Sequence, residues 1–219
     1  MLNPSTFRFL KSLKSNNNRE WFDKNKESYL KAKADVDLLV NDVIGELLKF
    51  DKSLAGLSAK DCVFRIYRDV RFSKDKRPYK TNMGASINAG GKKVMTPGFY
   101  LHLEPGGSFL AGGIWMPPGE ELRKIRQEID YNGKALHKIL KNAAFKKYYT
   151  AFESSYALKT TPKGYAKDHP DIELLKLTSF IVSHPFKDKE VLGKSFAKDV
   201  AKAGKIMQPM LDFLKVALS

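Results

Sequence analysis

Between Cys62 and Met116 the sequence alternates between apolar and polar residues, and short turn-forming segments interrupt the alternation. The alternating stretches lie near 62–72, 79–88, 98–104 and 109–116, and the segments between them contain SKDKRP, AGGKK and PGGS. Alternation with a period of two is typical of strands with one buried face, and successive strands joined by short turns pair in an antiparallel manner. The sequence therefore predicts an antiparallel β-sheet meander.

Helical patterns flank this region on both sides. A short amphipathic helix is expected over 5–14, and apolar residues at spacings of three, four and seven predict a long helix over 18–50, with Asn17 and Glu20 as a capping box. After the strands we expect helices from Pro118 and over 133–153, a short helix from Asp168, a strand at SFIVS and a terminal helix from Ser195. The predicted fold class is α+β, a single domain over 1–219 in which helices cover the sheet.

Composition bounds the class of protein. The N-terminal MLNPSTFRFLKSLK lacks the apolar region of a signal peptide, and no apolar run approaches the ~18 residues of a transmembrane helix. The single cysteine, Cys62, excludes an intramolecular disulfide framework. We therefore expect a cytoplasmic protein with no membrane partner, and nothing in the sequence predicts a cofactor.

The distribution of arginine is more informative than the net charge of +15, because lysines are scattered along the whole chain. The chain has eight arginines, and four of them, Arg65, Arg68, Arg71 and Arg77, fall within thirteen positions. Guanidinium groups bind carboxylate or phosphate through two parallel hydrogen bonds. Over 60–80 there are eight basic and three acidic residues, and aromatic residues lie among them. This clustering predicts a site for an anion such as phosphate.

Alternation divides the first predicted strand, 62–72, into two faces. Cys62, Phe64, Ile66, Val70 and Phe72 share the apolar face with Arg68, which breaks the pattern. We expect Arg68 to be functional. Arg65, Arg68 and Arg71 are predicted to clamp the anion, and Asp69 to orient them. Lys76, Tyr79 and Lys80 are predicted to form the rim of the site, with Tyr67 as a secondary contact. The alternative is a structural ladder of Arg65, Asp69 and Arg71 that binds nothing.

The segments RIYRDVRFSKDKRPYKT, YLHLEPGGSFLAGGIWMP, PKGYAKDHPDIELL and NNNREWFDKNK resemble the mainly bacterial family catalogued as domain of unknown function 2461. The family's motif, an arginine-rich strand followed by lysine, proline and tyrosine, falls on Arg65, Arg68, Asp69, Arg71, Phe72, Lys76, Pro78 and Tyr79. The resemblance spans most of the chain. It implies a compact α+β protein and no particular reaction.

Other residues offer weaker candidates for chemistry. His102 and Glu104 lie two apart on one predicted strand and, with Asp69, are the candidate catalytic residues. They supply two potential metal ligands without a visible third, so no metal site is predicted. Trp115 is a secondary candidate, because it directly precedes a predicted helix N-terminus, which can receive an anion. Lys163 and Tyr165 of the PKGY loop are secondary candidates for closing over the same site.

Three functions remain open from the sequence. The first is a domain that binds phosphate or another anion, with a nucleotide, a phosphorylated metabolite or a nucleic acid as ligand. The second is a hydrolase-like enzyme that acts on a phosphorylated or nucleic-acid substrate. The third is a structural or protein-interaction domain with an internal arginine–aspartate ladder.

Overall fold

The fold is known from a computed structural model that describes all residues, 1–219. It combines helices with a four-stranded sheet of order β1-β2-β3-β4, so the predicted α+β class and antiparallel meander are confirmed. The strands are β1 Met83–Ile87, β2 Gly98–Leu103, β3 Ser108–Ile114 and β4 Phe180–Phe186. None of the helices combines the length and the apolar character that a bilayer-spanning segment requires.

The chain divides into two compact units. Unit 1 comprises Met1–Val94, Tyr100–Leu110 and Pro185–Lys202, and unit 2 comprises Met95–Phe99, Ala111–His184 and Ala203–Ser219. The strands β2, β3 and β4 and the helix α9, Phe196–Ala217, have residues in both units. A single domain over 1–219 stays a prediction.

Unit 1 begins with three helices and continues with shorter ones. They are α1 Pro4–Ser15, α2 Arg19–Lys24, α3 Lys26–Leu47, η1 Lys52–Leu54, α4 Ala59–Cys62, η2 Gly91–Lys93 and α8 Asp188–Val191. The long N-terminal helix is present as α3, whose buried face includes Val36, Leu39, Val43 and Leu47. These spacings of three and four place the apolar side chains on one face, as the sequence predicts.

The predicted helix over 18–50 is divided at Asn25 in the structure. Asn25 has φ −111° and ψ 17°, outside the helical region, and its side chain donates to the carbonyl of Trp21. An asparagine that bonds nearby backbone in this way competes with the helical ladder. The capping prediction is wrong by one residue, because Asn18 rather than Asn17 accepts a hydrogen bond from the N–H of Trp21 and caps α2.

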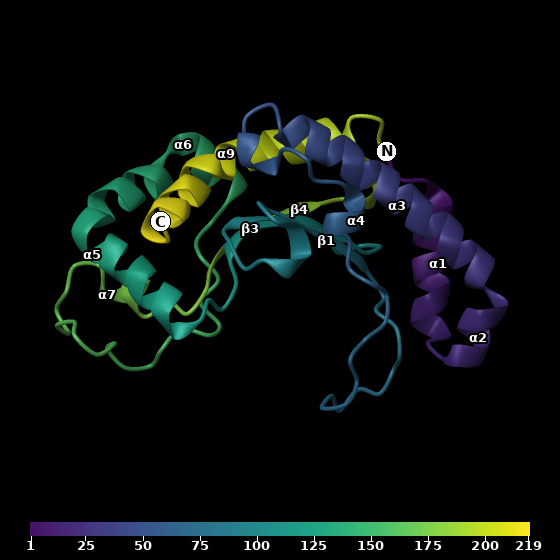
Figure 1. Cartoon of the computed structure of the whole chain (residues 1–219), viewed down its shortest axis with the longest axis horizontal. Helices are drawn as coiled ribbons and strands as arrows, with labels where there is room; N and C mark the ends of the chain where they lie inside the picture. The colour runs from purple at the N-terminus through teal and green to yellow at the C-terminus, as the bar shows by residue number, and fades with distance from the viewer. The chain divides into compact units, whose positions relative to one another are not determined.

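The segment between α4 and β1 is not the regular strand that alternation predicts over 62–72. It contains only two isolated bridges, Val63 with Ala85 and Tyr67 with Tyr79. Residues 64–80, which we call the arm, form a long loop that extends away from the sheet and helices of unit 1 and returns to β1 (Figure 1). Residues 70–77 at its far end are the tip. Phe64 and Phe72, expected on a buried face, are 37% and 95% exposed, because the segment is not a regular strand with one face on the core.

Unit 2 contains α5 Gly119–Lys141, α6 Ala143–Tyr148 and α7 Ile172–Leu175, together with parts of the strands and of α9. Gly112 of β3 lies directly under Met207 of α9, and a Cβ on this glycine would meet the Met207 sulfur. The glycine therefore allows close packing of helix on sheet, which is the ordinary reason for such a residue in a strand.

Candidate functional site

A hollow of ≈ 370 Å³ opens in unit 1 at the base of the arm. Three of the residues predicted to bind an anion, Arg68, Asp69 and Lys80, line it. The full lining consists of Phe64, Arg68, Asp69, Lys80, Asn82, Gly84 and Tyr100. Gly84 belongs to β1 and Tyr100 to the neighbouring strand β2, and the pairing of these strands brings residues distant in sequence together here.

Lys80 is partly buried and is the one cation of this hollow without a carboxylate partner. Its backbone N–H donates to the carbonyl of Ile66 at 2.8 Å, which holds the residue in the arm. Its ammonium lies 5.3 Å from the centroid of the Phe64 ring and forms no ion pair or hydrogen bond with the chain. Burial lowers the pKa of Lys80, and the nearby positive charge of Arg65 lowers it further. An anion in the hollow would relieve both effects.

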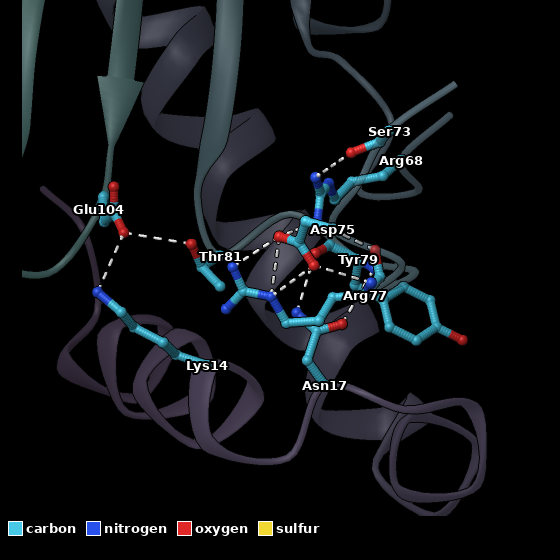
Figure 2. Close-up of polar contacts among 9 residues, drawn as sticks. All are labelled: Lys14, Asn17, Arg68, Ser73, Asp75, Arg77, Tyr79, Thr81 and Glu104. Atoms are coloured by element: carbon cyan, nitrogen blue, oxygen red, sulfur yellow. Dashed lines mark hydrogen bonds and ion pairs between the residues drawn. The ribbon is translucent and has the colours of Figure 1, made fainter. Parts of the chain in front are cut away.

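Arg68 also lines the hollow, but its guanidinium is engaged within the arm (Figure 2). Its Nη1 donates to Asp75 Oδ2 at 2.7 Å and to the Arg77 carbonyl at 3.2 Å, and its Nη2 lies 3.4 Å from Ser73 Oγ. Arg77 donates to the same Asp75 carboxylate at 2.7 and 3.0 Å. The pKa of Asp75 lies far below its ordinary range because Arg77 and then Arg68 donate to it.

Asp75 is a residue that the sequence interpretation missed. Its position in SKDKRP indicated only a polar turn, and the pairing with Arg68 across the turn depends on how the arm folds back. One signal was available, since Asp75 and Arg77 are two residues apart, like Asp69 and Arg71. In both pairs the carboxylate accepts from the backbone N–H as well as the guanidinium of the arginine.

Asp69 binds Arg71 rather than a group inside the hollow. Arg71 donates from Nη2 to Asp69 Oδ2 at 2.6 Å and from Nε to Oδ1 at 3.0 Å, and its side chain is 77% exposed. These bonds lower the pKa of Asp69. Arg65 is exposed and has no bonded partner. The structure therefore does not bring three free guanidinium groups together, and the role of these arginines as anion clamps stays a prediction.

The predicted rim residues take different positions. Lys76 donates to the carbonyl of Val70 at 3.1 Å, so it closes the tip on itself. Tyr79 is buried, and its ring stacks on Phe22 of α2, so it anchors the arm and does not form a rim. Tyr67 is half-exposed and packs beside Tyr79, with ring centroids 5.5 Å apart. Of the rim set, only Lys80 reaches the hollow.

A row of polar side chains runs along one face of β2 from the hollow. The hydroxyl of Tyr100 lies 3.3 Å from His102 Nδ1, and His102 Nε2 lies 3.3 Å from Glu104 Oε2. The ring of Phe109 stacks on His102 with centroids 4.6 Å apart. Burial raises the pKa of Tyr100. The structure thus joins the candidate pair His102 and Glu104 to the hollow through Tyr100, which the sequence interpretation did not include.

Glu104 ends this row and contacts Thr81 and Lys14 (Figure 2). Its Oε1 accepts from the hydroxyl of Thr81 at 3.2 Å and lies 3.6 Å from the ammonium of Lys14. The carboxylate therefore has partners on both oxygens. No three His, Cys, Asp or Glu side chains in the chain are grouped so that they could hold a metal ion.

The chain matches the family described as "Conserved hypothetical protein (DUF2461)" over residues 5–213. It belongs to this family. The DUF2461 match includes the arm, the residues that line the hollow, and the row of Tyr100, His102 and Glu104. It confirms the resemblance carried by the arginine-rich motif. No curated protein and no solved structure matches the chain.

Three secondary candidates of this DUF2461 chain, Trp115, Lys163 and Tyr165, lie in unit 2. Trp115 is half-exposed and meets Tyr156 edge to face, with centroids 5.3 Å apart. Tyr165 instead packs edge to face on His169 at 6.1 Å, and burial raises its pKa. Lys163 is exposed. Trp115 and Tyr165 thus have different aromatic partners, and their closing over one ligand stays a prediction.

Proposed function

We propose that the hollow at the base of the arm binds the phosphate group of a small ligand. The observation that supports this most is Lys80, a partly buried ammonium without a carboxylate partner. Arg65 adds positive potential nearby, as its effect on the pKa of Lys80 indicates. Nucleotides, phosphorylated metabolites and nucleic acids share this phosphate chemistry.

The hollow offers further groups to such a ligand. Asn82 and Tyr100 line it, and they carry an amide and a hydroxyl that can donate. Each hydrogen bond to a charged group contributes roughly 1.5–3 kcal/mol, so two of them correspond to about millimolar affinity for phosphate alone. The ring of Phe64 offers a surface on which an attached base would stack, which favours nucleotides over inorganic phosphate.

Calorimetric titration tests this proposal, with inorganic phosphate, a nucleoside monophosphate and the matching nucleoside as separate ligands. We expect binding of both phosphates, no binding of the nucleoside, and at least about tenfold weaker binding to Lys80→Ala than to the parent. Lys80→Arg should retain binding, because it keeps the charge. Lys74→Ala is the matched control, since Lys74 is an exposed lysine of the tip that does not line the hollow.

Two outcomes would refute the proposal. The first is a parent protein that binds neither phosphate, and the second is Lys80→Ala with unchanged affinity. Arg71→Ala separates the proposal from the clamp that the sequence predicts. Because Arg71 is paired with Asp69 at the surface, we expect this variant to bind phosphate like the parent.

A second candidate function is acid–base catalysis on the same ligand, favoured by the row Tyr100, His102 and Glu104. Tyr100 lines the hollow, and its hydroxyl is hydrogen-bonded to the His102 imidazole, which contacts the Glu104 carboxylate. This order of groups has the connectivity of a proton relay. Hydrolysis of phosphate mono- and diesters, with and without Mg²⁺ or Mn²⁺, tests it. Turnover that falls with His102→Gln supports catalysis, and absence of turnover in the parent leaves a binding protein.

A third candidate is a structural role for the arginines, favoured by the shared carboxylate of Asp75. In that case Arg68→Ala lowers the melting temperature and leaves phosphate affinity unchanged. Because Arg68 is only partly exposed and holds three partners in the arm, we expect some loss of stability under either function. The phosphate titration of this variant therefore decides between them.

A further inference from the structure

The tip of the arm presents an aromatic ring to solvent. Phe72 is 95% exposed, more than any other large apolar side chain of the chain. The guanidinium carbon of Arg71 lies 5.9 Å from the centroid of this ring. A single exposed apolar residue is ordinary in a soluble protein, so exposure alone does not mark a binding surface. What distinguishes Phe72 is the way in which the surrounding tip is held.

Hydrogen bonds close the tip on itself around Phe72. The ammonium of Lys76 and the N–H of Ser73 both donate to the carbonyl of Val70. Asp75 ties the tip to Arg68 at the base of the arm. These bonds use the polar groups of the tip and leave the ring uncovered. The ring is therefore oriented outward by a cross-linked turn, which reduces the entropy lost when a partner binds it.

The charge around the ring is strongly positive. The arm contains seven basic and two acidic residues, and both carboxylates, Asp69 and Asp75, are bound by arginines. Lys74, two residues from Phe72, is exposed and has no bonded partner. A polyanion approaching the tip therefore meets cations whose charge is only partly neutralised.

We propose that the tip of the arm binds single-stranded nucleic acid, with the Phe72 ring stacked on a base and Lys74, Lys76 and Arg77 near the phosphates. Single strands offer both unpaired bases and phosphates, and one exposed ring is enough for a stacking contact. This inference goes beyond the proposed phosphate site, because no residue of the tip lines the hollow.

An anionic membrane is the competing partner, because basic loops with aromatic residues also bind lipid headgroups. The tip offers only one exposed apolar side chain, and its neighbours Arg71, Ser73 and Lys74 are polar. Membrane anchoring that is stable generally takes more apolar area or a second signal. Stacking needs a single ring, so the composition of the tip favours a nucleic-acid strand.

Fluorescence anisotropy with a labelled single strand of about 15 nucleotides tests the inference. We expect Phe72→Ala to weaken binding about 5- to 100-fold, the range that the loss of one stacking contact produces. Phe72→Leu should lose as much, because leucine is apolar but has no π-face. Phe72→Trp should retain binding, and its added indole should be quenched by the strand. Tyr131→Ala is the matched control, since Tyr131 is an aromatic residue of α5 that is 72% exposed.

The remaining measurements separate stacking from charge and from folding. The salt dependence of affinity should be unchanged in Phe72→Ala and less steep in Lys74→Ala, by about 0.7 in the slope of the logarithms for each lost phosphate contact. A duplex of the same sequence should bind more weakly, because its bases are already stacked. Thermal melting of each variant verifies that the tip substitutions leave the fold intact, as expected for exposed side chains.

Three results would overturn the inference: a parent that does not bind the strand, Phe72→Ala with unchanged affinity, or loss of strand affinity in Tyr131→Ala equal to that in Phe72→Ala. Binding to vesicles that contain phosphatidylserine, retained in Phe72→Leu and unaccompanied by strand binding, would assign the tip to membranes instead. Lys80→Ala distinguishes this inference from the proposed function. If that variant loses phosphate binding and retains strand binding, both the phosphate site in the hollow and the nucleic-acid site at the tip are supported. If its phosphate binding is unchanged, only the phosphate site is refuted.

Discussion

The ring of Tyr79 stacks on the ring of Phe22, with centroids 3.9 Å apart and planes 13° from parallel. Tyr79 belongs to the arm and Phe22 to α2, so this contact joins two segments of unit 1 that are distant in sequence. Asn17 strengthens the junction, because its side chain donates to the carbonyl of Tyr79 at 2.9 Å and accepts from the Tyr79 N–H at 3.1 Å (Figure 2). The base of the arm is thereby fixed, while its tip extends into solvent.

This junction makes Tyr79 a residue of the core, and its substitution should cost stability. We expect Tyr79→Ala to lower the free energy of unfolding by about 3 kcal/mol, the usual cost of removing a buried aromatic ring. Tyr79→Phe should be nearly neutral, since it keeps the stacked ring. Tyr67→Ala is the control in the same cluster, and it should cost less because Tyr67 is half-exposed. Urea denaturation measures all three. Equal losses for Tyr79→Ala and Tyr67→Ala would contradict the assignment.

Asn17 also shows where sequence interpretation reaches its limit. Its spacing to Glu20 is that of a capping box, which is a local pattern. In the structure Asn18 caps the helix, and Asn17 bonds both backbone groups of Tyr79. A long-range partner of this kind leaves no trace in local spacing. Both residues are asparagine, so the sequence could not show which of them caps the helix.

The strands also show which features local patterns predict and which depend on long-range contacts. Alternation correctly predicted the sheet, because β1, β2 and β3 each have a neighbour to pair with and a face to bury. Alternation also predicted a strand over 62–72, where the chain instead forms the arm. There the charged side chains bond one another across the turn, as Arg68 does with Asp75. Their clustering was visible in the sequence, but the pairing of each arginine depends on the fold of the arm.

Acid should loosen the tip of the arm through Asp75. Its pKa is lowered in the folded state by Arg77 and Arg68 from an ordinary value of 3.8. The carboxyl has a lower pKa in the folded state than in the unfolded state. The ion pairs of Asp75 with Arg77 and Arg68 therefore stabilise the tip fully above the ordinary pKa, and this stabilisation is lost as the pH falls through the folded pKa. Titration of the carboxyl carbon by NMR should show Asp75 ionising below the ordinary range.

Substitution of Arg77 should reverse part of this shift. In Arg77→Gln the guanidinium that lowers the pKa of Asp75 most is absent, so the carboxyl should titrate at a higher pH than in the parent. Lys74→Gln removes a neighbouring charge without removing a partner of Asp75, and it should leave the titration nearly unchanged. An identical titration curve in the parent and in Arg77→Gln would disprove the shared-carboxylate geometry.

Cys62 should be an unreactive thiol in the folded protein. It is fully buried at the end of α4, and burial raises its pKa from 9.0 to about 11. The thiolate is the reactive form, so near neutral pH the native chain should react slowly with a thiol-specific disulfide reagent. The same reagent should modify one thiol per chain in denaturant, because Cys62 is the single cysteine. Rapid modification under native conditions would show that the α4 region opens readily.

Gly133 should be intolerant of any side chain, because Oδ2 of Asp171 lies where its Cβ would be. Asp171 cannot simply turn away, since its other oxygen is hydrogen-bonded to His137 of α5. We therefore expect Gly133→Ala to lower the free energy of unfolding by about 1–3 kcal/mol, although alanine favours helix. Gly119→Ala, on the same helix with open space around its Cβ, should be neutral or stabilising by up to about 1 kcal/mol.

A double substitution identifies the cause of the expected loss. In Gly133→Ala with Asp171→Ala the new methyl group no longer meets a carboxylate, so the double variant should lose less than the sum of the two single variants. Chemical denaturation of the four proteins of this cycle measures the coupling. Strict additivity would mean that the alanine destabilises α5 itself rather than its contact with Asp171. A loss smaller than the sum would instead show that the destabilisation arises from the contact between α5 and Asp171, which directly precedes α7.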